Sequence, residues 1–136
     1  MSNREIKFRG KRIDSGEWVY GHYIIDANER HCIYTKLEVF NCIPETIGQF
    51  TGLKDKNWKD IFEGDIIQQG NNPECWFAPR AVEFINGSWA GKHNNSDTYI
   101  RIYVEQDQRY YQSMVSNHKW EIIGNVHGNA ELLKFI

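Results

Sequence analysis

The chain of 136 residues has no long apolar run and few cysteines. Its longest uninterrupted apolar stretch is the four residues from Cys75 to Ala78. A membrane-spanning helix needs roughly twenty apolar residues, and the core of a secretory signal needs about seven or more. We therefore expect a protein that does not associate with a membrane and that resides in the cytoplasm.

Metal-binding and disulfide patterns are also missing. The three cysteines and five histidines are scattered, with no Cys-x-x-Cys unit and no His-Glu-x-x-His motif. Cysteine and histidine ligands for zinc normally occur at short, regular spacings, and a disulfide framework needs an even number of cysteines. The sequence thus predicts no disulfide framework, no metal site and no cofactor.

No charge excess and no standard catalytic motif is present. Sixteen basic residues against eighteen acidic residues give a net charge of −2, so the composition as a whole does not indicate a polyanionic partner. The chain has no Gly-x-Gly-x-x-Gly, no Walker A lysine and no Gly-x-Ser-x-Gly elbow. These absences favour a noncatalytic protein.

What the sequence does contain is a repeated alternation of apolar and polar residues, with turn formers every eight to twelve residues or so, which is typical of β proteins. Asn86-Gly87 predicts a two-residue hairpin turn, and Gly70 to Pro73 predicts a loop. We expect a mainly β fold (β-rich α+β) with few short helices, at Asp107 to Val115 and at Ala130 to Leu133. The expected strands include Ile6–Arg9, Trp18–Tyr23, His31–Tyr34, Glu38–Ile43, Ile61–Gln68, Ala81–Ile85, Ser88–Ala90, Tyr99–Val104 and Trp120–Val126.

Four carboxylates are concentrated between positions 55 and 65, interleaved with lysines. Such a group is able to share a divalent ion or to divide acid and base roles, which would suit a metal-dependent enzyme. Alternating charges in a turn-rich segment are more typical of a solvated loop, and this interpretation is favoured. The cluster consists of Asp55, Asp60, Glu63 and Asp65.

Five of the sixteen basic residues lie within the first twelve positions. On a strand, several of them would share one face, where Trp18, Tyr20 and Tyr23 from the next strand would offer rings for base stacking. The alternative is an edge strand whose cations face solvent and whose aromatic neighbours are buried. The candidate nucleic-acid contacts are Arg4, Lys7, Arg9, Lys11 and Arg12.

Nineteen aromatic residues supply enough apolar surface for both a sheet core and a protein interface. Those in the most polar surroundings are the candidate interface residues, although burial in the core is the simpler interpretation for most of them. The candidates are Trp58, Trp76, Phe77, Tyr110 and Tyr111.

Two motifs together resemble the YopX family of phage and prophage proteins. The first runs from Thr51 to Asn57 and continues from Ile61 to Ile67; the second runs from Glu121 to Val126 and on to Leu133. Ile6-Lys7-Phe8-Arg9 also fits the family's opening. The motif residues that we expect to be structural are Gly52, Asp55, Asn57, Glu63, Gly64, Asp65, Gly124 and Asn125.

At Trp58 the sequence departs from the family, which usually has glycine there. A tryptophan with positive φ carries a steric penalty. The sequence therefore predicts either that Asn57 takes the left-handed position or that the loop is remodelled and presents the indole.

The resemblance implies a phage or prophage accessory protein of a bacterial host, with no known catalytic residues, that acts through homo-oligomer formation and binding of a phage or host protein. Glu63-Gly64-Asp65 also looks like the start of the first long strand of many SH3-like barrels. We expect a single domain over 1–136, with an N-terminal hairpin lobe at 1–45 and a small barrel at 46–136.

Overall fold

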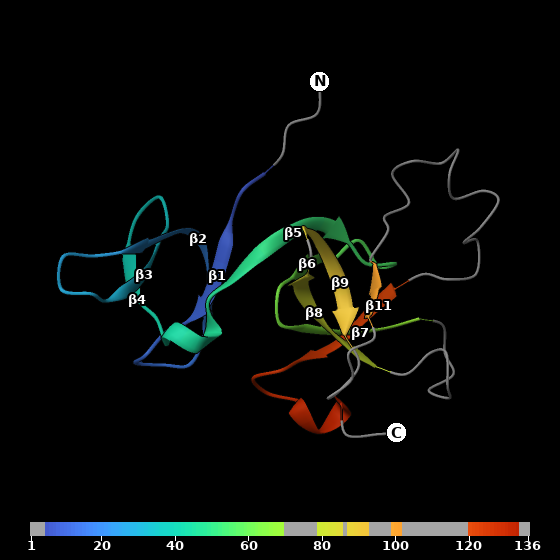
Figure 1. Cartoon of the computed structure of the whole chain (residues 1–136). Helices are drawn as coiled ribbons and strands as arrows, with labels where there is room; N and C mark the ends of the chain where they lie inside the picture. The colour runs from blue at the N-terminus through green and yellow to red at the C-terminus, as the bar shows by residue number, and fades with distance from the viewer. Residues whose placement is uncertain (1–4, 70–78, 86, 93–98, 102–119, 134–136) are drawn as a thin grey trace. The chain divides into compact units, whose positions relative to one another are not determined.

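The computed structural model describes residues 5–69, 79–85, 87–92, 99–101 and 120–133 (Figure 1). The chain divides into two compact units, Met1–Gly52 and Leu53–Ile136, and the division falls within one strand. The expected boundary between 45 and 46 stays a prediction. Each unit is described by itself below.

The first unit is an antiparallel sheet with strand order β4-β3-β2-β1-β5. Alternating aromatic and β-branched residues account for the longest strand, β2, because such side chains fit a pleated surface. A short 3-10 helix, η1, precedes the last strand of the unit. The elements are β1 (Phe8–Lys11), β2 (Trp18–Ile25), β3 (His31–Tyr34), β4 (Val39–Asn41), η1 (Pro44–Thr46) and β5 (Gly48–Lys54).

One face of this sheet carries the unit's apolar core. Ile33 is 0% exposed and Cys42 is 1% exposed. The Phe8 and Tyr23 rings pack together on the same face, with centroids 5.4 Å apart. An isolated bridge between Arg12 and Cys42 joins the chain after β1 to the chain after β4.

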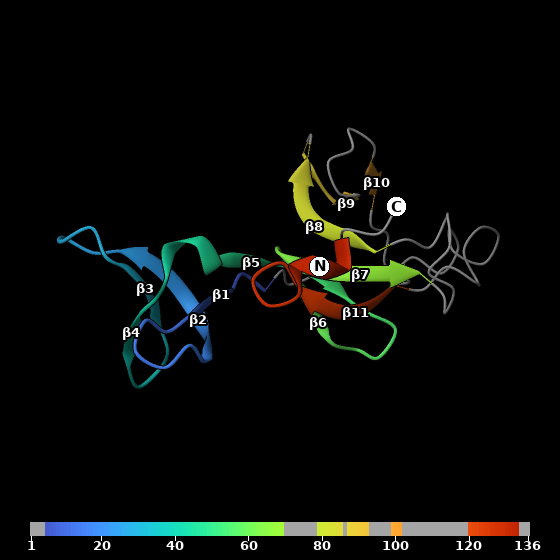
Figure 2. The ribbon, with the colours of Figure 1, turned by 90° about the horizontal axis from the view of Figure 1, so that it is seen from below.

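The second unit begins with the end of β5 and with β6, its neighbour in the sheet, and contains a five-stranded antiparallel sheet of order β10-β9-β8-β7-β11. Figure 2 shows β7 and β11 side by side, and their pairing has a bulge between Ile122 and Gly124. The elements are β6 (Asp60–Phe62), β7 (Asp65–Gln69), β8 (Arg80–Ile85), β9 (Ser88–Lys92), β10 (Tyr99–Arg101), β11 (Trp120–Asn125) and the 3-10 helix η3 (Ala130–Leu133).

Four side chains from four strands form the core of this unit. Ile61 of β6, Ile67 of β7, Val82 of β8 and Trp120 of β11 are each at most 6% exposed and form one cluster. Burial of an aliphatic or aromatic side chain of this size contributes about 1.5–3 kcal/mol. Strands distant in sequence thus contribute to one apolar cluster.

The mainly β class is confirmed, whereas the SH3-like barrel is not, because neither sheet closes on itself within the described residues. Gly87 has φ of +83°, as the Asn-Gly hairpin requires; Asn86 lies outside the described residues. The expected terminal turn is η3, and Asp107–Val115 lies outside the described residues. In the part of the chain that the structure describes, no helix has the length and apolar character needed to cross a membrane.

Gly64 stands at the bend between β6 and β7, where its φ is +92°. The Asp65 carboxylate closes this bend by accepting a hydrogen bond from the Phe62 amide at 2.8 Å. Around the bend, Ile61, Phe62, Ile66 and Ile67 are all buried. The bend thus directs apolar side chains into the interior from both of its sides.

We expect Gly64→Val to lower the free energy of unfolding by about 1–3 kcal/mol, because a β-branched residue is strained at this φ. The control is Gly128→Val, since an added Cβ there would meet only Asn125 Oδ1, at 3.7 Å. Chemical denaturation of both variants measures the difference. Equal stability of the two variants would contradict the role assigned to Gly64.

Candidate functional site

The side chain of Asp55 organises the turn between β5 and β6. Its Oδ1 accepts hydrogen bonds from the amides of Asn57 at 2.8 Å and Lys59 at 2.9 Å. Its Oδ2 accepts one from the amide of Ile122 in β11, at 3.1 Å. The carboxylate is thus a structural acceptor, and Asp55 is only 6% exposed.

The same turn covers the outer edge of β11. In the five-stranded sheet β11 pairs with β7 alone, which leaves its other side facing the turn. The Lys56 amide donates to the Trp120 carbonyl at 2.8 Å, next to the bond from Ile122 to Asp55. Together these two bonds satisfy backbone groups that an edge strand would otherwise present to a neighbouring chain.

Trp58 takes the left-handed position in this turn, with φ of +64°. Of the two predicted alternatives, a left-handed Asn57 is wrong, because the positive φ falls at Trp58 itself, whose amide donates to the Asp55 carbonyl at 2.9 Å. This is the pattern of a β-turn followed by a left-handed bulge residue, usually glycine. The Trp58 side chain is 78% exposed, so the turn presents its indole to solvent.

A second turn in the first unit has the same construction. Asp26 Oδ1 accepts hydrogen bonds from the amides of Asn28 and Arg30, and Glu29 has φ of +62°. The Arg30 amide, more than any other group, lowers the pKa of Asp26 below its ordinary value. Both turns read Asp-x-Asn-x-basic, a repeated signal that could have placed the left-handed residue from sequence alone.

The other three carboxylates of the acidic cluster have separate environments. Asp60 pairs with Lys54 at 2.6 Å, Asp65 accepts from the Phe62 amide, and Glu63 is exposed. Among the described residues, which include all four carboxylates, no three His, Cys, Asp or Glu side chains form a group suited to a metal ion. Turn formation accounts for two of these acids, Asp55 and Asp65.

The basic residues of the opening strand lie against aromatic rings. The Arg9 guanidinium lies 4.2 Å from the Trp18 ring centroid, and the Lys11 ammonium lies 5.3 Å from it. Lys7 is 4.9 Å from the Phe50 ring centroid. Arg9 is only 6% exposed, whereas Lys7 and Lys11 are half-buried. Tyr23, proposed as a stacking surface, lies on the opposite face, and Arg4 lies outside the described residues.

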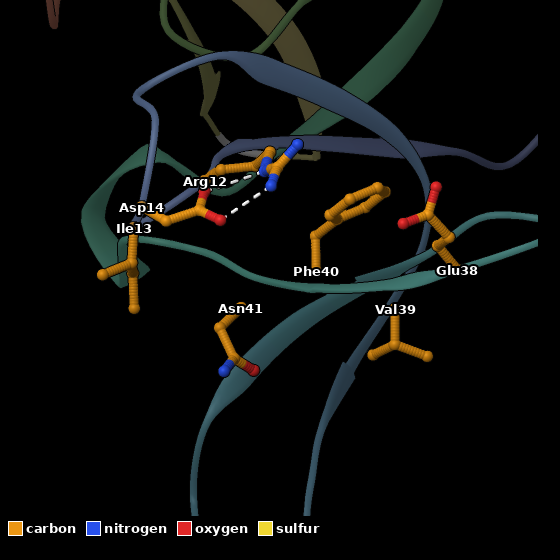
Figure 3. Close-up of a pocket in the computed structure, with 7 residues that line it drawn as sticks. All are labelled: Arg12, Ile13, Asp14, Glu38, Val39, Phe40 and Asn41. Carbon is orange, nitrogen blue, oxygen red and sulfur yellow. Dashed lines mark hydrogen bonds and ion pairs between the residues drawn. The ribbon is translucent and has the colours of Figure 1, made fainter.

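Arg12 belongs to a pocket of about 330 Å³ in the first unit (Figure 3). Its guanidinium makes two hydrogen bonds to Asp14, at 2.9 and 2.7 Å, and lies 4.6 Å from the Phe40 ring centroid. The hydrogen bonds to Asp14 raise the pKa of Arg12, and they lower the pKa of Asp14. The pocket thus holds one cation, which is paired with Asp14, and a second carboxylate, Glu38. Its lining residues are Arg12, Ile13, Asp14, Glu38, Val39, Phe40 and Asn41.

Of the five candidate interface aromatics, the structure describes Trp58; Trp76, Phe77, Tyr110 and Tyr111 lie outside the described residues. Phe84, which was not among these candidates, is 57% exposed and packs edge-on against Trp89. Alternation gave no signal for this exposure, because residues two apart on a strand share a face and Phe84 follows the buried Val82 in that way along β8.

The closing motif forms a compact turn after β11. Asn125 Oδ1 accepts from the amides of His127 and Gly128, and the Asn125 amide donates to Asn129 Oδ1 at 3.3 Å. A Cβ at Gly124 would lie 2.6 Å from Asn129 Oδ1. The last motif residue, Gly52, has φ of +85° in β5. The described motif residues thus form turns and bends.

These features define a β-rich protein whose two motifs are structural. The family described as YopX protein matches residues 7–134, and the chain belongs to this family. Among solved structures it is similar to protein EF1440 from Enterococcus faecalis, with a TM-score of 0.52 and 20% identity over 97% of this chain and 100% of that one. This likeness concerns the fold. Comparison with curated proteins gave no match.

We expect Asp55→Asn to lower the free energy of unfolding by about 2–3 kcal/mol. The asparagine side chain has a single acceptor oxygen, and the backbone N–H groups that bind Asp55 would lose a charged acceptor. The matched control is Asp60→Asn, which removes a partly exposed ion pair and should cost less than about 1 kcal/mol. Denaturant titration of both variants measures the two changes in the free energy of unfolding. A smaller effect at Asp55 than at Asp60 would contradict the structural role of Asp55.

Proposed function

We propose that this protein is a noncatalytic phage or prophage accessory protein that acts in the host cytoplasm by self-assembly and by binding a phage or host protein. The observation that carries this proposal is Trp58, whose indole is 78% exposed on a turn fixed by buried hydrogen bonds. Tryptophan is enriched among the residues that dominate binding energy at protein interfaces.

The strain at Trp58 supports a role at the surface. A left-handed conformation costs an L-residue about 1–2 kcal/mol, and this tryptophan recovers little of that cost by burial. Strained residues tend to occur at functional sites, since a purely structural turn could use glycine. A rigid, exposed indole also loses little conformational entropy when a partner covers it.

The expected result is concentration-dependent association in sedimentation velocity, weakened about tenfold or more by Trp58→Gly because the main aromatic contact is removed. Glu29→Gly is the matched control, since it relieves the same backbone strain at the equivalent turn and leaves the indole in place. Both variants should be folded and no less stable than the parent protein.

A strict monomer at high concentration, or equal association of the parent and Trp58→Gly, would overturn the self-assembly part. The partner part is tested by affinity capture from prophage-induced cells, with and without nuclease, using the parent and Trp58→Gly as baits. A captured protein that depends on Trp58 and survives nuclease supports this part. Capture that is unchanged by Trp58→Gly contradicts it.

A further inference from the structure

The second face of the first unit's sheet, opposite its apolar core, combines rings and cations at neighbouring positions. Directly opposed residues in an antiparallel pair share a face, and so do residues two apart on one strand. Arg9 opposes Tyr20, and His22 opposes Tyr34. Arg9, Tyr20, His22 and Tyr34 therefore lie on one face of β1, β2 and β3.

The rings on this face are accessible. Tyr20 is 49% exposed, Tyr34 is 38% exposed, and His22 is also exposed. Val39 of β4 opposes Tyr34 and is exposed, which extends the face by one strand. A soluble domain usually turns polar side chains outward on such a face, so exposed rings on adjacent strands indicate a contact surface.

Cations outnumber acids on this face. Lys7 and Lys11 flank Arg9 at two-residue intervals, and the residues that the described strands β1 to β4 place on this face include no acid. Carboxylates at its margins face cations: Glu5 lies 3.7 Å from Lys7, and Asp26 lies 2.8 Å from Arg30. A locally positive surface on a chain of net charge −2 selects an anionic partner.

We propose that this face binds single-stranded nucleic acid, with bases stacked on Tyr20, His22 and Tyr34 and phosphates near Lys7 and Lys11. Sheet faces that carry aromatic rings beside basic residues hold single strands in this way, since every base has a flat surface for stacking. In a duplex the bases are stacked on each other and cannot lie on the rings. An acidic protein would satisfy the cations but would have no specific use for three exposed rings.

Arg9 has a positioning role in this arrangement. It is buried over the Trp18 ring and so fixes the strand between the two lysines rather than contacting phosphate itself. This assignment differs from the sequence expectation, which treated all five basic residues as contacts and took Tyr23 in place of Tyr34. The proposed binding face lies in the first unit, whereas Trp58 lies in the second, so this proposal does not depend on Trp58.

The test is fluorescence anisotropy of the full chain with a labelled oligothymidylate of about 16 nucleotides, at low salt and along a salt series. We expect binding that weakens about tenfold for each of Tyr20→Ala and Tyr34→Ala. Lys7→Gln and Lys11→Gln should each reduce the slope of log affinity against log salt by about 0.7. Glu5→Gln should tighten binding, because it removes the carboxylate beside Lys7.

Two control variants separate this face from nonspecific attraction. Phe84→Ala removes an exposed ring from the second unit, and Lys36→Gln removes an exposed cation from a turn of the first. Neither should change the affinity appreciably. No binding at low salt, an equal affinity for a duplex of the same length, or equal losses in the controls would overturn the proposal. The outcome is separable from the self-assembly result, since that result depends on Trp58 and this one on Tyr20 and Tyr34.

Discussion

One buried carboxylate holds the second unit's turn and terminal strand in register. Asp55 accepts hydrogen bonds from backbone amides of its own turn and from the amide of Ile122, 67 positions further along the chain. The local bonds fix the turn, and the distant bond fixes the turn to β11, whose Trp120 completes the core cluster. Because the two sets share one side chain, the exposed indole of Trp58 and the buried indole of Trp120 depend on the same interaction.

The chain uses this physical solution twice, with different results. At both turns an aspartate accepts hydrogen bonds from two local amides, and a non-glycine residue takes the left-handed position. At the first turn that residue is Glu29, a polar side chain at an exposed position. At the second turn it is Trp58, where solvation of an indole is unfavourable. This contrast supports the proposal that Trp58 binds a partner in addition to its place in the turn.

Strand positions were largely predictable, because alternation and turn formers depend on local sequence. His31–Tyr34 was predicted with its observed bounds, whereas the strand predicted over Ile61–Gln68 is divided by the bend at Gly64 into β6 and β7. The use of Asp55 was not predictable, since its third partner is set by tertiary packing. Nor was the burial of Arg9 predictable, because alternation places it on the outer face and the ring of Trp18 on the neighbouring strand covers it. Sheet closure likewise depends on long-range pairing, and the barrel expectation is not confirmed.

Amide hydrogen exchange of the parent protein followed by NMR tests the central role of Asp55 most directly. If the carboxylate joins the turn to β11, the amides of Asn57, Lys59 and Ile122 exchange slowly and open together. The Ile122 amide should then be protected to about the same degree as those of the paired strand β7. Rapid exchange at Ile122 beside a protected β7, or independent opening of Lys59 and Ile122, would contradict the account.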